Sequence, residues 1–152
     1  MKEILLAYAS MSGNTEAIAD LIEEELVKHG LNVKRAEVYD IDASDLVSAE
    51  SIIFGAYTWG DGELPDDFLD LYDEMDDIDL SQKQMAVFGS GDSSYDVFCG
   101  AVDLIEEKIK RRNGNIAVPG LKIELSPFGE DIEKCKIFAK GFAEVVAKSA
   151  AS

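Results

Sequence analysis

Short apolar runs alternate with helical patterns along the whole chain, and the alternation predicts its secondary structure. Runs of strand length, apolar or alternating apolar and polar, predict strands over 3–9, 31–38, 51–58, 84–90 and 116–125. Between and after them, apolar residues at helical spacing predict helices over 15–29, 42–50, 65–75, 97–112 and 131–148. Ser44 is a possible N-cap of the second helix, and Pro65 suits the first turn of the third.

Strands alternating with helices are typical of an α/β protein. The pattern predicts a doubly wound, five-stranded parallel sheet with helices on both faces. The first, third and fourth strands are the most apolar and should be central, whereas the polar second strand belongs at an edge. The strand order 2-1-3-4-5 fits. No repeat or linker interrupts the chain, so residues 1–152 are expected to form one domain.

Composition narrows the function classes. The net charge of −17 argues against nucleic acid and anionic membrane surfaces as partners. The apolar N-terminal stretch is too short to span a bilayer and lacks a signal peptide's cleavage pattern, so we expect a cytoplasmic protein. Cys99 and Cys135 form no CxxC motif, and His29 is the only histidine, at an expected helix end. These residues indicate neither a metal site nor a catalytic centre.

Three loops follow the three strands expected at the centre, and the carboxyl ends of parallel strands are where such sheets bind ligands. The loops are SMSGNT (10–15), TWGDGELP (58–65) and SGDSSYDVF (90–98). The first leads into a helix and offers hydroxyls, an amide and a glycine, which suits an anion. It is no Walker loop, because it has no lysine. An ordinary strand-to-helix turn capped by Thr15 or Asn14 is an equally weighted alternative.

The other two loops each carry an aromatic residue among glycines and small polar residues. Trp59 and Tyr95 lie at strand ends and not on a periodic core face. Two aromatic rings beside an anion site can sandwich a flat ring. Other proteins of this topology are excluded by their required residues: a receiver domain needs an aspartate ending strand 3, and a small tyrosine phosphatase needs cysteine and arginine in the first loop.

With these three motifs in this order, the chain resembles the flavodoxins. It is similar over essentially its whole length to the short-chain kind, and GSGDSSYDVFCGAVD (89–103) is very close to the pattern of those from sulfate-reducing bacteria. The resemblance implies tightly bound flavin mononucleotide (FMN). It implies a low-potential one-electron carrier, not an enzyme, that uses the flavin semiquinone/hydroquinone couple between redox proteins. An FMN-dependent reductase of quinones is the alternative.

The resemblance also implies which residues hold the cofactor. The phosphate would be bound by the first loop, through Ser10, Met11 (by its backbone N–H), Ser12, Gly13, Asn14 and Thr15. The inner wall of the ring site would be Thr58, Trp59, Gly60 and Asp61. The outer wall would be Ser90, Gly91, Asp92, Tyr95 and Phe98. The peptide after Gly60 can rotate its carbonyl toward the flavin N5, because glycine tolerates positive φ.

The distribution of charge bears on both potential and docking. Ten acidic residues lie between Asp61 and Asp79, and a basic cluster occupies 108–112 at a helix end. One carboxylate about 10 Å from a reduced flavin, at an effective dielectric near ~40, costs about 0.8 kcal/mol, or about 35 mV. We therefore expect a negative redox edge, a positive opposite edge, and a monomer that docks partner proteins with basic surfaces.

Overall fold

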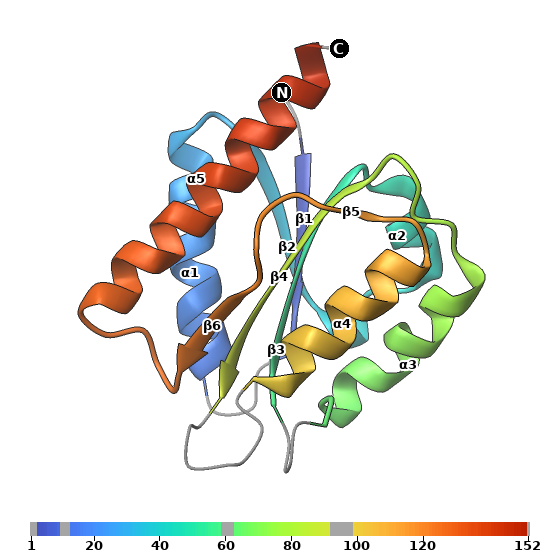
Figure 1. Ribbon diagram of the computed structural model, residues 1–152, viewed down its shortest axis with the longest axis horizontal. Coiled ribbons are helices and arrows are strands. Elements are labelled where there is room, and N and C mark those ends of the chain that lie inside the picture. Colours follow the sequence, from blue (N-terminus) through green and yellow to red (C-terminus); the bar gives the residue numbers. More distant parts are fainter. Residues whose placement is uncertain (1–2, 10–12, 59–62, 92–98, 152) are drawn as a thin grey trace.

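The computed structural model describes residues 3–9, 13–58, 63–91 and 99–151. Within them, a six-stranded parallel sheet is covered by helices on both faces (Figure 1). The strands are β1 (Glu3–Tyr8), β2 (Asn32–Glu37), β3 (Ser51–Tyr57), β4 (Gln84–Gly91), β5 (Asn115–Ile116) and β6 (Leu121–Glu124). Their order is β2-β1-β3-β4-β5, with β6 also paired to β4. The predicted fold class and strand order are confirmed.

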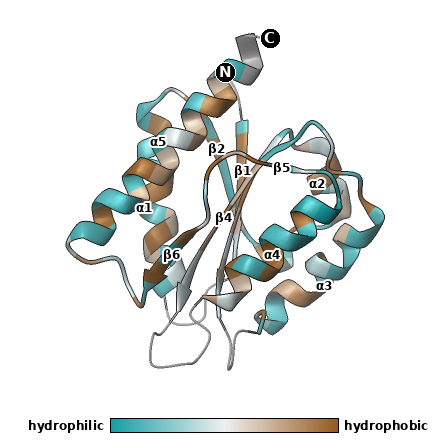
Figure 2. Ribbon diagram, viewed as in Figure 1, coloured by the Kyte–Doolittle hydropathy of each residue, from teal (hydrophilic) through white to brown (hydrophobic). Residues whose placement is uncertain are grey.

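Helices on the two faces enclose separate cores. They are α1 (Asn14–Lys28), α2 (Ala43–Ser48), α3 (Asp66–Glu74), α4 (Gly100–Arg111) and α5 (Glu130–Ala151), with short 3-10 helices η1 (Val38–Asp40) and η2 (Met75–Asp77). One core lies between the sheet and α1 with α5, and the other between the sheet and α2, α3 and α4. Figure 2 shows α4 and α5 each carrying hydrophilic and hydrophobic residues, as expected of helices that cover a sheet.

The predicted fifth strand over 116–125 is wrong as one continuous element. It is divided into β5 and β6, and both pieces pair with β4. Pro119 lies in the break and has no N–H to give a strand ladder. Beside it, Gly120 lies against α4, since a Cβ there would stand 2.9 Å from a Val102 methyl. In the break the chain leaves its pairing with β4 and lies against α4 before it rejoins the sheet.

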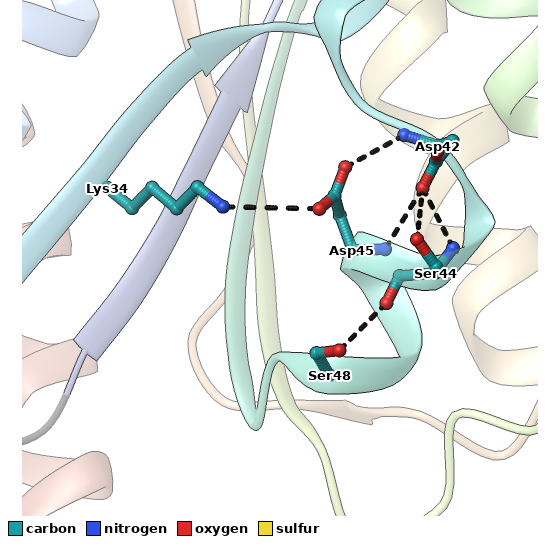
Figure 3. A network of polar contacts seen from close by, with 5 residues as sticks. All are labelled: Lys34, Asp42, Ser44, Asp45 and Ser48. Carbon is teal, nitrogen blue, oxygen red and sulfur yellow. Dashed lines mark hydrogen bonds and ion pairs between the residues drawn. The ribbon is translucent and has the colours of Figure 1, made fainter.

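The second helix begins with a different cap from the one predicted. Asp42, not Ser44, is the N-cap of α2, and its carboxylate accepts from the backbone N–H groups of Ser44 and Asp45. Asp45 returns a carboxylate oxygen to the Asp42 N–H, which completes a capping box (Figure 3). Lys34 on β2 approaches Asp45 at 4.0 Å. The cap therefore fixes a short helix beside the edge strand.

Other helix ends follow their sequence signals. Gly30, with φ +82°, ends α1 while the Leu31 N–H donates to the Leu26 carbonyl. Asn113, with φ +72°, ends α4 in the same way. Pro65 stands one residue before α3, as its N-cap, and α5 continues to Ala151, three residues past the predicted end. The predicted start of the fourth helix at Val97 lies outside the described residues, which have α4 from Gly100.

Candidate functional site

The start of α1 has the form of an anion site. The helix follows Gly13, whose φ is +89°, and among the described residues no side chain caps it. A Cβ built on Gly13 would have no atom within 4 Å. A helix start without a side-chain cap offers backbone N–H groups and the positive end of the helix dipole. Thr15 and Asn14 are therefore wrong as the predicted caps, because the N-cap position is occupied by Gly13.

The side chains of the first turn are instead tied to distant parts of the chain. The Thr15 hydroxyl lies 2.8 Å from that of Ser90 at the end of β4, and both residues are buried. The Ser126 hydroxyl donates to the Asn14 amide oxygen at 2.6 Å. These bonds join α1 to β4 and to the segment after β6, which are 75 and 112 residues away in the sequence.

The ends of β3 and β4 are joined by hydrogen bonds near the start of α1. The Thr58 N–H donates to the Ser90 carbonyl at 3.1 Å, and the Thr58 hydroxyl accepts from the Ala101 N–H at the start of α4. Gly91 leaves no room for a side chain, since a Cβ there would lie 2.8 Å from the Cys99 sulfur. The first and last described residues around the loop after β4 are thus held together.

The structure describes part of the predicted site. It brings Gly13, Asn14, Thr15, Thr58, Ser90 and Gly91 to the carboxyl edge of the sheet. The remaining predicted residues lie outside the described ranges: Ser10, Met11, Ser12, Trp59, Gly60, Asp61, Asp92, Tyr95 and Phe98.

Sequence reasoning missed a fourth loop at this edge. The segment 125–129 follows β6, and its Ser126 reaches Asn14 while the Leu125 N–H donates to the Gly91 carbonyl at 2.8 Å. Leu125 has φ +54°, and Phe128 is 84% exposed. The signal was present, because Ser126-Pro127 and Gly129 mark a turn after a strand. The predicted strand over 116–125 included the first residue of this loop and so hid where the strand ends.

Carboxylates gather on α3, whose N-terminus faces the same edge. A hollow of about 310 Å³ is lined by Asp66, Asp67, Asp70 and Glu74 together with Val38, Tyr39, Ile41 and Leu71. Tyr57, at the end of β3, has its pKa raised by burial and then by Asp67 and Asp66. Across the hollow, a hydrogen bond to Glu37 raises the pKa of Tyr39 to about 12. The hollow is therefore a region of negative potential.

Comparison with known proteins identifies the family. The flavodoxin family model matches residues 6–138. The chain is 54% identical over 145 residues to "Probable flavodoxin 2" of Bacillus subtilis, covering 95% of this chain and 96% of that one. It is 40% identical to the flavodoxin of Maridesulfovibrio salexigens, covering 87% and 92%. The crystal structure of oxidised flavodoxin 2 from Bacillus cereus superimposes with a TM-score of 0.91 at 51% identity, covering 94% and 99%.

The chain belongs to the flavodoxin family. The family consists of FMN-binding electron carriers, so this chain is a flavoprotein of electron transport with FMN as its cofactor. The described residues fit the phosphate end of that cofactor. They supply an open glycine, backbone N–H groups, a hydroxyl and an amide, and no basic side chain lies in the 10–15 loop.

The predicted basic cluster of this flavodoxin lies at the opposite edge, where two of its members are engaged internally. Lys108 is buried and its ammonium contacts the Asp76 carboxylate at 2.6 Å and the Tyr72 carbonyl at 3.1 Å. The Arg112 guanidinium donates to the Ile78 carbonyl. Asp76 belongs to the 61–79 acidic run, and Lys108 lowers its pKa. The end of that run is therefore partly neutralised and distant from the site.

The cysteines and the histidine are structural. Cys99 and Cys135 are free and buried, and burial raises the pKa of each thiol to about 11. His29 follows α1 and contacts Glu25 one turn earlier. No group of metal-ligating side chains occurs among the described residues. In the described part of the chain, no helix has the length and apolar character to cross a membrane.

Proposed function

We propose that this chain carries single electrons between redox proteins at low potential, through the semiquinone/hydroquinone couple of its FMN. One observation supports this above the others: α1 begins at a glycine after a loop with no basic residue, and α3 carries several carboxylates at the same edge of the sheet. A phosphate held without a cation keeps its charge, and nearby carboxylates add to it. A negative environment disfavours adding an electron to the cofactor and lowers its potential.

The proposal includes the cofactor contacts. Gly13, Asn14 and Thr15 act with Ser10, Met11 and Ser12 on the phosphate, Thr58 with Trp59, Gly60 and Asp61 on the inner face, and Ser90 and Gly91 with Asp92, Tyr95 and Phe98 on the outer face. The family resemblance and the described part of the site support this assignment. The protein works as a monomer, without substrate turnover, and partners with basic surfaces dock on its acidic edge.

A reductive titration followed by visible absorption tests the proposal. The purified protein should be yellow and should take up two electrons in two separate steps, the second at a clearly lower potential. Gly60→Ala should bring the two midpoint potentials closer together, whereas Gly30→Ala, beyond the far end of α1, should leave their separation unchanged. A single two-electron step in the unmodified protein would contradict the one-electron role.

A second measurement separates the carrier from an enzyme. The protein is mixed with a pyridine nucleotide and a quinone, with no partner protein added. We expect no steady turnover. Sustained turnover at a rate proportional to protein concentration would favour the quinone reductase.

A further inference from the structure

Two hydroxyl groups behind the start of α1 contact the polar side chains of its first turn. Ser90 comes from β4 and Ser126 from the segment after β6, so neither belongs to the helix. Thr15 and Ser90 are 1% and 2% exposed, so their bond is sheltered from water. Such a bond holds both side chains in fixed orientations.

A threonine hydroxyl has one hydrogen to donate and two lone pairs. If Thr15 donates its hydrogen to Ser90, it has none left for an anion. If Ser90 donates to Thr15, the Thr15 hydrogen is free for an anion. An anion at the helix start selects the second arrangement, because only that arrangement offers it a donor.

The amide of Asn14 is likewise oriented by a hydroxyl group outside the helix. An amide presents a donor at one end and an acceptor at the other, and an acceptor facing an anion is unfavourable. Ser126 donates to the Asn14 oxygen at 2.6 Å, which occupies the acceptor end. The N–H groups of the amide are then the part available to a ligand. Ser126 is exposed, so its bond competes with water and should contribute less than the buried one.

We propose that Ser90 and Ser126 are positioning residues, which orient Thr15 and Asn14 as hydrogen-bond donors toward the FMN phosphate. The inference rests on the proposed cofactor contacts and changes the role of Ser90 from a wall of the ring site to a support of the phosphate site. It also brings in Ser126, a residue of the fourth loop. Thr15 and Asn14 thus act on the phosphate as uncharged hydrogen-bond donors, and Ser90 and Ser126 determine that they donate.

The test compares two ligands that differ only in the phosphate. The flavin-free full chain is titrated with FMN and with riboflavin, and both dissociation constants are measured from flavin fluorescence. The quantity compared is the dissociation constant of riboflavin divided by that of FMN, called the ratio below. Ser90→Ala should weaken FMN binding about tenfold and riboflavin binding by less than about twofold. Ser126→Ala should also weaken FMN binding more than riboflavin binding, and should lower the ratio about threefold.

Control variants separate positioning from stability. Ser51→Ala removes a buried hydroxyl at the other end of the sheet, and Ser48→Ala removes an exposed one on α2; neither should alter the ratio. Thr15→Val should reduce FMN affinity by itself, and adding Ser90→Ala to it should reduce the ratio no further, because Ser90 acts through Thr15. Urea unfolding of each variant shows that it is folded.

The outcomes distinguish the two levels of the argument. If the unmodified chain binds no FMN, the proposed function and this inference are both lost. If the unmodified chain binds FMN and Ser90→Ala loses stability with the ratio unchanged, the Thr15–Ser90 bond is structural only and the inference is wrong. An additive double variant would likewise overturn it, since Ser90 would then act independently of Thr15.

Discussion

Two helix ends at the amino edge of the sheet differ from the start of α1 at its carboxyl edge. At the amino edge, long basic side chains contact carbonyl groups where helices end. Lys83 donates to Val47 and Ala49 at the end of α2, and Lys108 donates to Tyr72 in the last turn of α3. Cations there complement the negative end of the helix dipole. At the carboxyl edge, α1 begins at Gly13, and no side chain of the described residues caps it.

The difference explains how the charge of an acidic protein can be unevenly distributed between the two edges of its sheet. Its cations at one edge are used in holding the fold together, while carboxylates on α3 line an open hollow toward the other. The 61–79 acidic run therefore divides into two parts. Asp76 is paired with Lys108, and Asp66, Asp67, Asp70 and Glu74 face the hollow. Stability and function should accordingly respond to different acidic and basic residues.

The largest expected effect is on the amino edge. Lys108→Ala should lower the free energy of unfolding by about 2–3 kcal/mol, because the Tyr72 carbonyl loses its buried donor and the aliphatic stem loses its packing. Lys110→Ala, on an exposed position of the same helix, should change it by less than about 0.5 kcal/mol. Urea unfolding at neutral pH measures both. Equal effects would show that Lys108 has no structural role.

An intermediate effect is expected at the carboxyl edge. Replacing Asp66, Asp70 and Glu74 by their amides should slow electron transfer to a basic acceptor such as cytochrome c about tenfold at low salt. Stopped-flow kinetics as a function of ionic strength measures this effect, and the difference should disappear at high salt.

A triple variant of equal charge at the other edge provides the control. It replaces Glu3, Asp77 and Glu107 by their amides, so the net charge changes equally. The rate should fall by less than about twofold. If both triple variants slow the reaction equally, net charge and not the α3 surface guides docking.

The smallest expected effect reports the potential in the hollow directly. Replacing Asp66 and Asp67 by asparagine should lower the pKa of Tyr57 toward its usual range, although part of the increase should remain because burial is the larger cause. Ultraviolet titration of the variant, with Tyr57→Phe as the reference, measures it. Asp73→Asn on the same helix is the control. An unchanged Tyr57 pKa would place the two carboxylates outside its electrostatic environment.

The raised pKa of Tyr57 also makes the stability of the protein depend on pH. Because its folded pKa lies above the unfolded one, Tyr57 contributes stability that is complete below the unfolded pKa and is lost as the pH rises through the folded pKa. In the double Asp66/Asp67 variant the folded pKa should lie nearer the unfolded one, so the loss of stability should be smaller and should end at a lower pH than in the unmodified protein.

Local sequence signals predicted the framework because they act within a few residues. Gly30 and Asn113 end helices through positive φ, and the polar β2 lies at an edge, as predicted. The errors come from competition between neighbours. Asp42 and Ser44 are both good N-caps, and only the box with Asp45 decides for Asp42. Pro119 was present in the sequence, but the division of the strand also involves the close approach of Gly120 to Val102 on α4, which a local pattern does not reveal.

Long-range pairs in the site were beyond the reach of pattern reasoning. The residue types of the first loop indicate an anion, and that much follows from hydroxyls and a glycine before a helix. That Thr15 bonds to Ser90, or that Ser126 meets Asn14, depends on how strand ends come together in three dimensions. The internal use of Lys108 was equally hidden, because a buried lysine and an exposed one look alike in a sequence.

The division of the last strand bears on how the protein behaves in concentrated solution. Unpaired strand edges invite neighbouring molecules to add to a sheet, and long flat edges are the most dangerous. Here the outer strands on one side are two and four residues long, and Lys122 of β6 is paired with Asp103 of α4. The other outer strand carries Lys34 and Arg35. Molecules that meet at the first side thus find little backbone to pair with, and at the second side they meet basic side chains; both features oppose aggregation.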